Sequence, residues 1–125
     1  MNALVIDDSK AMRSILRKIL TDIGFEVTEA GDGRQALECL KEGGKFELAL
    51  VDWNMPEMDG YEFVQAVRAD HDFDGVLLMM VTTEVEMERV VQALDAGANE
   101  YVMKPFTKDV ILEKLAMLDL IEPDA

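Results

Sequence analysis

Chemically active side chains follow four separate apolar runs of this 125-residue sequence. They are, in chain order, Asp7 and Asp8, then Asp52, then Thr82, and finally Lys104. If a fold gathers them, three carboxylates crowd together beside one hydroxyl and one ammonium group. Carboxylates at short range repel one another, so such a set favours a place that attracts a cation.

This combination suits the transfer of a phosphoryl group. Mg²⁺ prefers oxygen ligands, takes one or two carboxylates, and leaves octahedral positions for water or phosphate oxygens. A phosphoryl group in transfer carries charge on its equatorial oxygens, which the cation, the Lys104 ammonium and the Thr82 hydroxyl would neutralise. A carboxylate acting as nucleophile becomes an aspartyl phosphate. Asp52 is the candidate nucleophile, because it stands alone at the end of its apolar run, between the other groups.

Short apolar runs alternate along the chain with segments of helical period. The runs predict β-strands at 3–6, 25–29, 46–51, 76–81 and 100–103. The clearest helical stripe has i, i+3, i+4 and i+7 spacing, and it joins Met12, Ile15, Leu16, Ile19, Leu20 and Ile23. Four shorter stripes lie at 36–40, 63–67, 90–94 and 111–118. The chain therefore predicts five strands, each followed by a helix.

Local signals mark where several of these helices begin and end. Capping boxes, in which a side chain at the cap and one three residues later exchange hydrogen bonds, are expected at Asp32–Gln35, Asp59–Glu62 and Thr83–Glu86. Glycines that suit a left-handed C-terminal cap stand at 24, 43 and 97. These signals support the same division of the chain.

Successive strand–helix units predict an α/β fold: a doubly wound, five-stranded parallel sheet with helices on both faces. Strands buried on both sides of such a sheet read as continuous apolar runs, as at 48–51 and 76–81. In open parallel sheets, sites form outside the carboxyl ends of the strands. The carboxylates, the hydroxyl and the ammonium should therefore meet at one edge of the sheet.

Composition excludes several classes of function. The 12 basic and 26 acidic residues give a net charge of −14, which repels nucleic acid and anionic membranes. A single cysteine, Cys39, cannot form an internal disulfide, which suits a reducing cytosol. No apolar stretch approaches the length of a membrane span, and the N-terminus lacks the features of a signal peptide. We expect one cytoplasmic domain over 1–125.

Three longer motifs carry a family resemblance over the whole chain. They are VIDDSKAMR at 5–13, LVDWNMPEMDG at 50–60 and MVTTEVEMERVVQALDAGANEYVMKPF at 80–106. In this order and spacing they resemble the receiver domain of response regulators, most closely its chemotaxis members. The resemblance implies the flavodoxin-like strand order 2-1-3-4-5.

The resemblance also implies a role for each site residue. Asp52 matches the phosphorylated aspartate, and Mg²⁺ would be held by Asp8, Asp52, the backbone carbonyl of Asn54 and, mainly through water, Asp7. Lys104 matches the lysine that pairs with phosphoryl oxygens, and the Lys104–Pro105 bond matches a cis peptide of the family. Thr82 and Tyr101 match the hydroxyl and the aromatic ring of the family's switch, while Asn54 and Glu84 match positions that tune phosphoryl hydrolysis.

A stand-alone response regulator of a two-component phosphorelay, acting in chemotaxis, is the function implied. A histidine kinase would phosphorylate Asp52, and the chain would assist its own phosphorylation and dephosphorylation without being a classical enzyme; a phosphatase is a further partner to consider. Because the chain stops soon after the fifth expected helix, we expect no effector domain. The signal would leave through helix four, strand five and helix five, roughly 84–118, towards a flagellar motor switch protein. Acidic residues on this face, including Glu100 directly before Tyr101, favour a basic partner surface and depart from the chemotaxis pattern.

Other interpretations remain open at this point. The chain could be a phosphorelay carrier or phosphate sink that exchanges its phosphoryl group with a histidine phosphotransfer protein. A magnesium-dependent phosphohydrolase is disfavoured, since no DxD pair surrounds Asp52 and no inserted cap offers a substrate site. Among single residues, Tyr101 could be a tyrosine packed permanently in place.

Overall fold

A parallel sheet of five strands forms the centre of the computed structural model, which describes residues 1–43, 45–83 and 87–121. Its strands are β1 (Asn2–Ile6), β2 (Glu26–Ala30), β3 (Leu48–Asp52), β4 (Leu77–Thr82) and β5 (Glu100–Met103). Their order is β2-β1-β3-β4-β5, and every neighbouring pair is parallel. The expected flavodoxin-like topology is confirmed.

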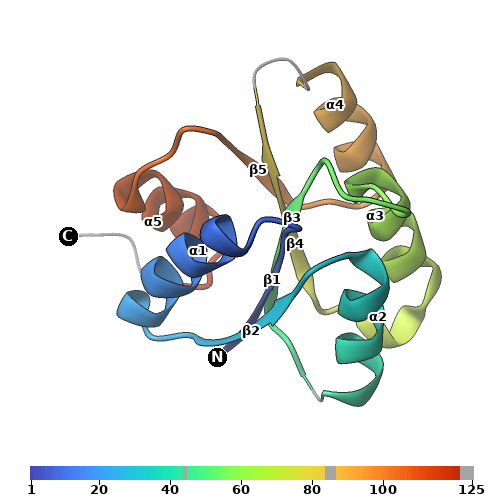
Figure 1. Cartoon of the computed structure of the whole chain (residues 1–125), viewed down its shortest axis with the longest axis horizontal. Coiled ribbons are helices and arrows are strands. Elements are labelled where there is room, and N and C mark those ends of the chain that lie inside the picture. The colour runs from blue at the N-terminus through green and yellow to red at the C-terminus, as the bar shows by residue number, and fades with distance from the viewer. Residues whose placement is uncertain (44, 84–86, 122–125) are drawn as a thin grey trace.

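Helices cover both faces of the sheet (Figure 1). In chain order they are α1 (Lys10–Ile23), α2 (Gly33–Glu42), α3 (Gly60–Ala69), the short 3₁₀ helix η1 (His71–Phe73), α4 (Met87–Ala96) and α5 (Lys108–Met117). In this view α1 and α5 lie on one side of the sheet, and α2, α3 and α4 lie on the other. Among the described residues, no helix combines the length and the apolar character that a membrane span requires.

Alternating side chains of the strands supply two separate cores. On β3, Ala49 and Val51 join the cluster under α2, α3 and α4, whereas Leu48 and Leu50 join the cluster under α1 and α5. All five residues of β3 are buried, as its apolar sequence predicted. Because β3 is the central strand, its last residue, Asp52, is held between two packed layers.

The sequence signals for helix ends are confirmed at some positions and wrong at others. Asp59 and Glu62 form the complete capping box, and Gly24 and Gly97 have the left-handed φ values of 118° and 124°. Gly43 does not, since its φ is −92° and its N–H bonds back to the Cys39 carbonyl. The Gln35 side chain accepts from the N–H of Gly31 instead of Asp32, so that capping box is only half formed.

Boundaries of the strands shift slightly from the expected ranges. β1 begins one residue earlier than predicted, β2 and β4 begin one residue later, and β3 begins two residues later. β2, β3 and β4 each end one residue later than predicted, so Asp52 and Thr82 are the last residues of their strands. The reason is ladder pairing, which a polar side chain does not prevent, since Asp52 pairs with Val81 and Thr82 with Met103. The expected capping box at Thr83–Glu86 extends beyond the described residues, and Glu84 lies outside them.

Gly60 fixes how α3 begins against the end of β3. A Cβ at this position would lie 3.0 Å from the Asp52 carbonyl oxygen, 3.1 Å from the Trp53 Cα and 2.7 Å from the Met80 Cε. The Gly60 N–H donates to the Trp53 carbonyl at 3.0 Å. Two of the three close atoms belong to backbone, so only glycine allows this approach.

We expect Gly60→Ala to lower the free energy of unfolding by roughly 1–3 kcal/mol, because the added methyl group must displace the backbone that carries Asp52. Gly75→Ala is the matched control, since a Cβ there meets no atom within 4 Å. Urea denaturation measures both variants. Equal midpoints for the two would contradict the close approach of α3 to β3.

Candidate functional site

Three carboxylates meet at the carboxyl ends of two adjacent strands, β1 and β3. Asp7 follows β1 and Asp52 ends β3, and the pairing of Ile6 with Val51 places these two ends side by side. One carboxylate oxygen from each of Asp7, Asp8 and Asp52 lies within 4.8 Å of the others. Asp7 and Asp52 are only 1% and 6% exposed, whereas Asp8 faces solvent. The structure thus brings together the acidic residues that the sequence predicted would cluster.

Lys104 supplies a positive charge to this cluster from the end of β5. Its Nζ lies 3.1 Å from Asp52 Oδ1 and 3.9 Å from Asp7 Oδ2. Its backbone N–H donates to the Thr82 carbonyl at 2.6 Å, which ties the lysine to the end of β4. The Lys104–Pro105 bond is cis, as expected. Lys104 is therefore positioned through both its backbone and its side chain.

Burial and mutual repulsion raise the pKa values of the two inner carboxylates. The pKa of Asp52 rises to about 6, first because of burial and then because of the nearby Asp7 charge, while Lys104 acts in the opposite direction. Burial also raises the pKa of Asp7, against a hydrogen bond of 2.8 Å from the Ser9 N–H that lowers it. The Lys104 ammonium thus does not neutralise the carboxylates of Asp7 and Asp52 fully.

The donor set fits a Mg²⁺ ion. Asp7 Oδ2 is buried and has no hydrogen-bond partner within the described chain, and Lys104 approaches it only to 3.9 Å. Asp8, exposed at the mouth of the cluster, leaves room for the waters that Mg²⁺ retains. Asn54, the predicted source of a carbonyl ligand, is exposed two residues after Asp52. Of the residues that the resemblance implies for the metal, the structure thus groups the three carboxylates of Asp7, Asp8 and Asp52 around one position.

Thr82 lies on β4, beside the strand of Asp52, and Tyr101 lies on β5, one strand further out. Thr82 is 1% exposed and comes one residue after Val81, the partner of Asp52 in the β3–β4 ladder. Its Oγ1 donates to the Thr83 carbonyl at 3.3 Å. Tyr101 is half-buried and packs against the core under α2, α3 and α4. The structure thus orders Asp52, Thr82 and Tyr101 across three adjacent strands, as the switch hypothesis requires.

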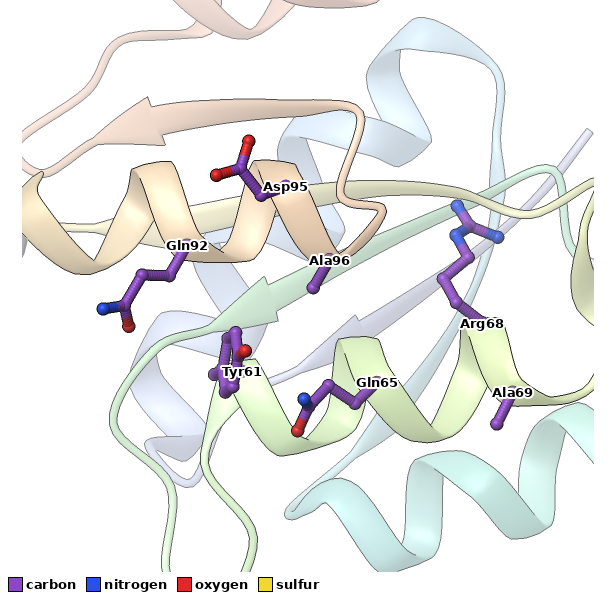
Figure 2. A pocket seen from close by; sticks show the side chains of 7 residues that line it. All are labelled: Tyr61, Gln65, Arg68, Ala69, Gln92, Asp95 and Ala96. Carbon is purple, nitrogen blue, oxygen red and sulfur yellow. The ribbon is translucent and has the colours of Figure 1, made fainter.

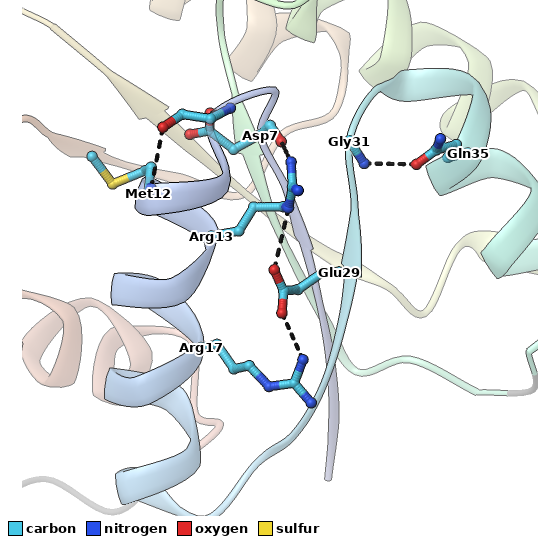
Figure 3. A network of polar contacts seen from close by, with 8 residues as sticks. Asp7, Met12, Arg13, Arg17, Glu29, Gly31 and Gln35 are labelled. Atoms are coloured by element: carbon cyan, nitrogen blue, oxygen red, sulfur yellow. Dashed lines mark hydrogen bonds and ion pairs between the residues drawn. The ribbon is translucent and has the colours of Figure 1, made fainter.

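Arg13 is a residue of this region to which the sequence analysis assigned no role. Its Nη1 donates to the Asp7 backbone carbonyl at 2.6 Å, and its Nε bonds Glu29 at 3.2 Å (Figure 3). Arg17, one helical turn later, bonds the same Glu29 carboxylate at 2.6 Å, and this bond is the main reason that the pKa of Glu29 is lowered. Arg13 thus links the Asp7 backbone to Glu29 of β2, and Arg17 holds the same Glu29 carboxylate.

A groove of about 650 Å³ lies elsewhere, between α3 and α4. Figure 2 shows Tyr61 and Gln65 of α3 facing Gln92 and Ala96 of α4 across it. None of its lining residues belongs to the acidic cluster. The groove is therefore separate from the candidate site.

Without divalent cations, we expect Asp52→Asn to stabilise the folded protein above neutral pH by on the order of 2 kcal/mol. Burial raises the folded-state pKa of Asp52 to about 6, so its contribution to stability is full below the unfolded-state pKa and is lost as pH rises through about 6. Urea titrations in a chelating buffer, from about pH 4 to about pH 8, measure the difference between variant and parent protein. The difference should grow with pH, unlike that for the exposed Asp95→Asn control; a constant difference would contradict the assigned pKa shift.

Comparison with known proteins agrees with this geometry. The sequence pattern that defines the response regulator receiver domain matches residues 3–116. Chemotaxis protein CheY1 of Helicobacter pylori is 44% identical over 119 residues, covering 94% of this chain and 96% of that protein. Chemotaxis protein CheY of Pseudomonas aeruginosa is 43% identical, covering 92% and 93%. The solved structure of the chemotaxis response regulator CheY4 of Vibrio cholerae superimposes with a TM-score of 0.86 at 35% identity, covering 94% and 97%. The chain therefore belongs to the receiver domain family of response regulators and is a CheY-like member of two-component signalling.

Proposed function

We propose that this protein accepts a phosphoryl group on Asp52 from a histidine kinase in the cytoplasm and thereby signals in chemotaxis. The observation that carries the proposal is the buried Asp52 carboxylate, 3.1 Å from Lys104 and grouped with Asp7 and Asp8. The relatives named chemotaxis proteins match over nearly their whole lengths, which supports the chemotaxis assignment.

In the transfer, an Asp52 carboxylate oxygen attacks the phosphorus of a phosphohistidine. The new oxygen–phosphorus bond forms as the phosphorus–nitrogen bond breaks, and the imidazole nitrogen leaves with the electron pair. An Asp52 pKa of about 6 keeps the carboxylate largely ionised at neutral pH, and it makes the oxygen a stronger base than an ordinary aspartate. The chain is thus a phosphoacceptor that assists its own modification.

Charge at the site would stabilise the product. Asp8, Asp52, the Asn54 carbonyl and Asp7 would hold Mg²⁺, which would supply positive charge to stabilise the phosphoryl group. Lys104 forms an ion pair with Asp52 in this structure, and its ammonium would pair instead with the phosphoryl oxygens once Asp52 is phosphorylated. The hydrogen bond between the Lys104 backbone and the Thr82 carbonyl anchors this residue at the end of β4, from which its side chain reaches the site.

The response would pass from Asp52 to the surface through Thr82 and Tyr101. A phosphoryl group adds negative charge and acceptor oxygens, and the Thr82 hydroxyl reaches them by moving towards β3. The movement would make space for the Tyr101 ring, which lies on the next strand. The surface formed by α4, β5 and α5 would then bind a downstream protein, with a flagellar motor switch protein as the favoured target. We call the state in which the Tyr101 ring has moved towards Thr82 the inward state. Phosphorylation favours it by population shift, through contacts that only this state makes.

Kinase-independent labelling tests the phosphoacceptor. A small acyl phosphate with Mg²⁺ should add one phosphoryl group to the parent protein, and Asp52→Asn should abolish the addition because it removes the nucleophile. Intact-mass spectrometry measures both, and Asp95→Asn is the matched control with an exposed acid on α4. Undiminished labelling of Asp52→Asn would overturn the proposed function.

Thr82→Ala should separate phosphorylation from the response. The variant keeps Asp52 and should still be labelled, but it lacks the hydroxyl that moves, so the Tyr101 ring signals in NMR should no longer shift when beryllofluoride mimics the phosphoryl group. Thr82→Ser keeps the hydroxyl and should behave as the parent protein. If the Tyr101 signals of the parent protein do not change with beryllofluoride, the phosphate carrier or sink becomes the better interpretation.

A further inference from the structure

Tyr101 is held at the edge of the sheet by a pair of charged residues. The Lys114 Nζ of α5 lies over the Tyr101 ring, 4.6 Å from its centroid. The same ammonium lies 3.3 Å from the Glu100 Oε1, and this oxygen also accepts the Tyr101 backbone N–H at 3.0 Å. The Glu100 carboxylate thus holds both the Lys114 ammonium and the backbone of Tyr101, and the same ammonium covers the Tyr101 ring.

We propose that Glu100 and Lys114 form a lock that holds Tyr101 in its resting position and so sets the threshold of the switch. The inference rests on the proposed function, because it assigns a regulator to the ring movement described above. The lock is closed in the state in which Lys104 pairs with the Asp52 carboxylate. Glu100 and Lys114 are positioning residues, acting on Tyr101 and not on the phosphoryl group.

The contact crosses from one layer of the fold to the other. α5 packs on the face of the sheet where Val102 is buried, whereas Tyr101 belongs to the core of the opposite face. β5 is the last strand of the sheet, so a long side chain on α5 can pass its edge and cover the ring. Lys114 therefore connects α5, which is part of the proposed binding surface, directly to Tyr101 around the edge of the sheet.

Partial burial strengthens the lock. The side chains of Lys114 and Glu100 are only 22% and 14% exposed, so solvent screens their interaction less than that of a surface pair. A cation over an aromatic face gains more when it is desolvated. The carboxylate keeps the ammonium from turning to solvent, which makes Glu100 necessary for the contact although it does not touch the ring face itself.

Movement of the ring towards Thr82 would break this contact. The resting state then contains a favourable interaction that the inward state lacks, and the equilibrium between the two is displaced towards rest. By reciprocity, anything that weakens the contact makes a ligand of the inward state bind more tightly. The lock also explains the unusual acidity before Tyr101, since the Glu100 charge is paired inside the chain and is not offered to a partner.

Beryllofluoride binding in the presence of Mg²⁺ tests the lock. Lys114→Met keeps an unbranched side chain but removes the cation, and it should raise the affinity for beryllofluoride by about 2- to 5-fold. The Tyr101 ring signals of its free form should move towards their beryllofluoride-bound positions. Glu100→Gln should act in the same direction, and Lys114→Arg, which retains the cation, should restore the parent behaviour.

Matched controls separate the lock from a general effect of charge. Lys108→Met removes an exposed cation from the start of α5 and should leave both readouts unchanged. In a Tyr101→Leu background, Lys114→Met should no longer change the affinity, because the ring through which it acts is absent.

Two results would contradict the proposal in different ways. Unchanged beryllofluoride affinity and unchanged Tyr101 signals in Lys114→Met would overturn the lock while leaving the phosphoacceptor intact. Failure of the parent protein to bind beryllofluoride with Mg²⁺ would overturn the proposed function and the lock with it.

Discussion

Repulsion between the buried carboxylates of Asp7 and Asp52 is the constraint around which the site is built. Both groups are buried at the ends of the adjacent strands β1 and β3, and their pKa values rise because burial and proximity disfavour charge. Lys104 compensates only part of this charge. The negative charge that remains gives the cluster a donor set that fits a cation, so the feature that destabilises the fold locally is also the one that suits the site to a metal ion.

The rest of the structure holds this unfavourable arrangement in place. Gly60 lets α3 approach the backbone of Asp52, Arg13 anchors the carbonyl of Asp7, and the Lys104 backbone is bonded to the end of β4. These contacts come from three different elements and converge on the strand ends. A group that would otherwise turn to solvent is thereby fixed where its charge is least favourable.

Much of the fold could be predicted from the sequence, because period and position are local properties. Five apolar runs and the stripe of α1 gave the strands and helices, and the polar residues at the strand ends gave the acidic cluster. The role of Arg13 and the pair formed by Glu100 and Lys114 could not be predicted, because they join residues on different elements and depend on how side chains cross the sheet. The conformation of Gly43 was mistaken because a glycine permits a left-handed cap but does not require one.

The strand order leaves β2 and β5 at the two ends of the sheet, each with an unpaired row of backbone groups. Such rows invite pairing with strands of other molecules unless charge discourages it. Glu26 and Glu29 lie on β2, and Glu100 lies on β5 with the Lys114 ammonium beside it. Any second copy that extended the sheet would have to bury these charges. The same residues that organise these contacts therefore also place charge along both edges of the sheet, where it disfavours pairing with strands of another molecule.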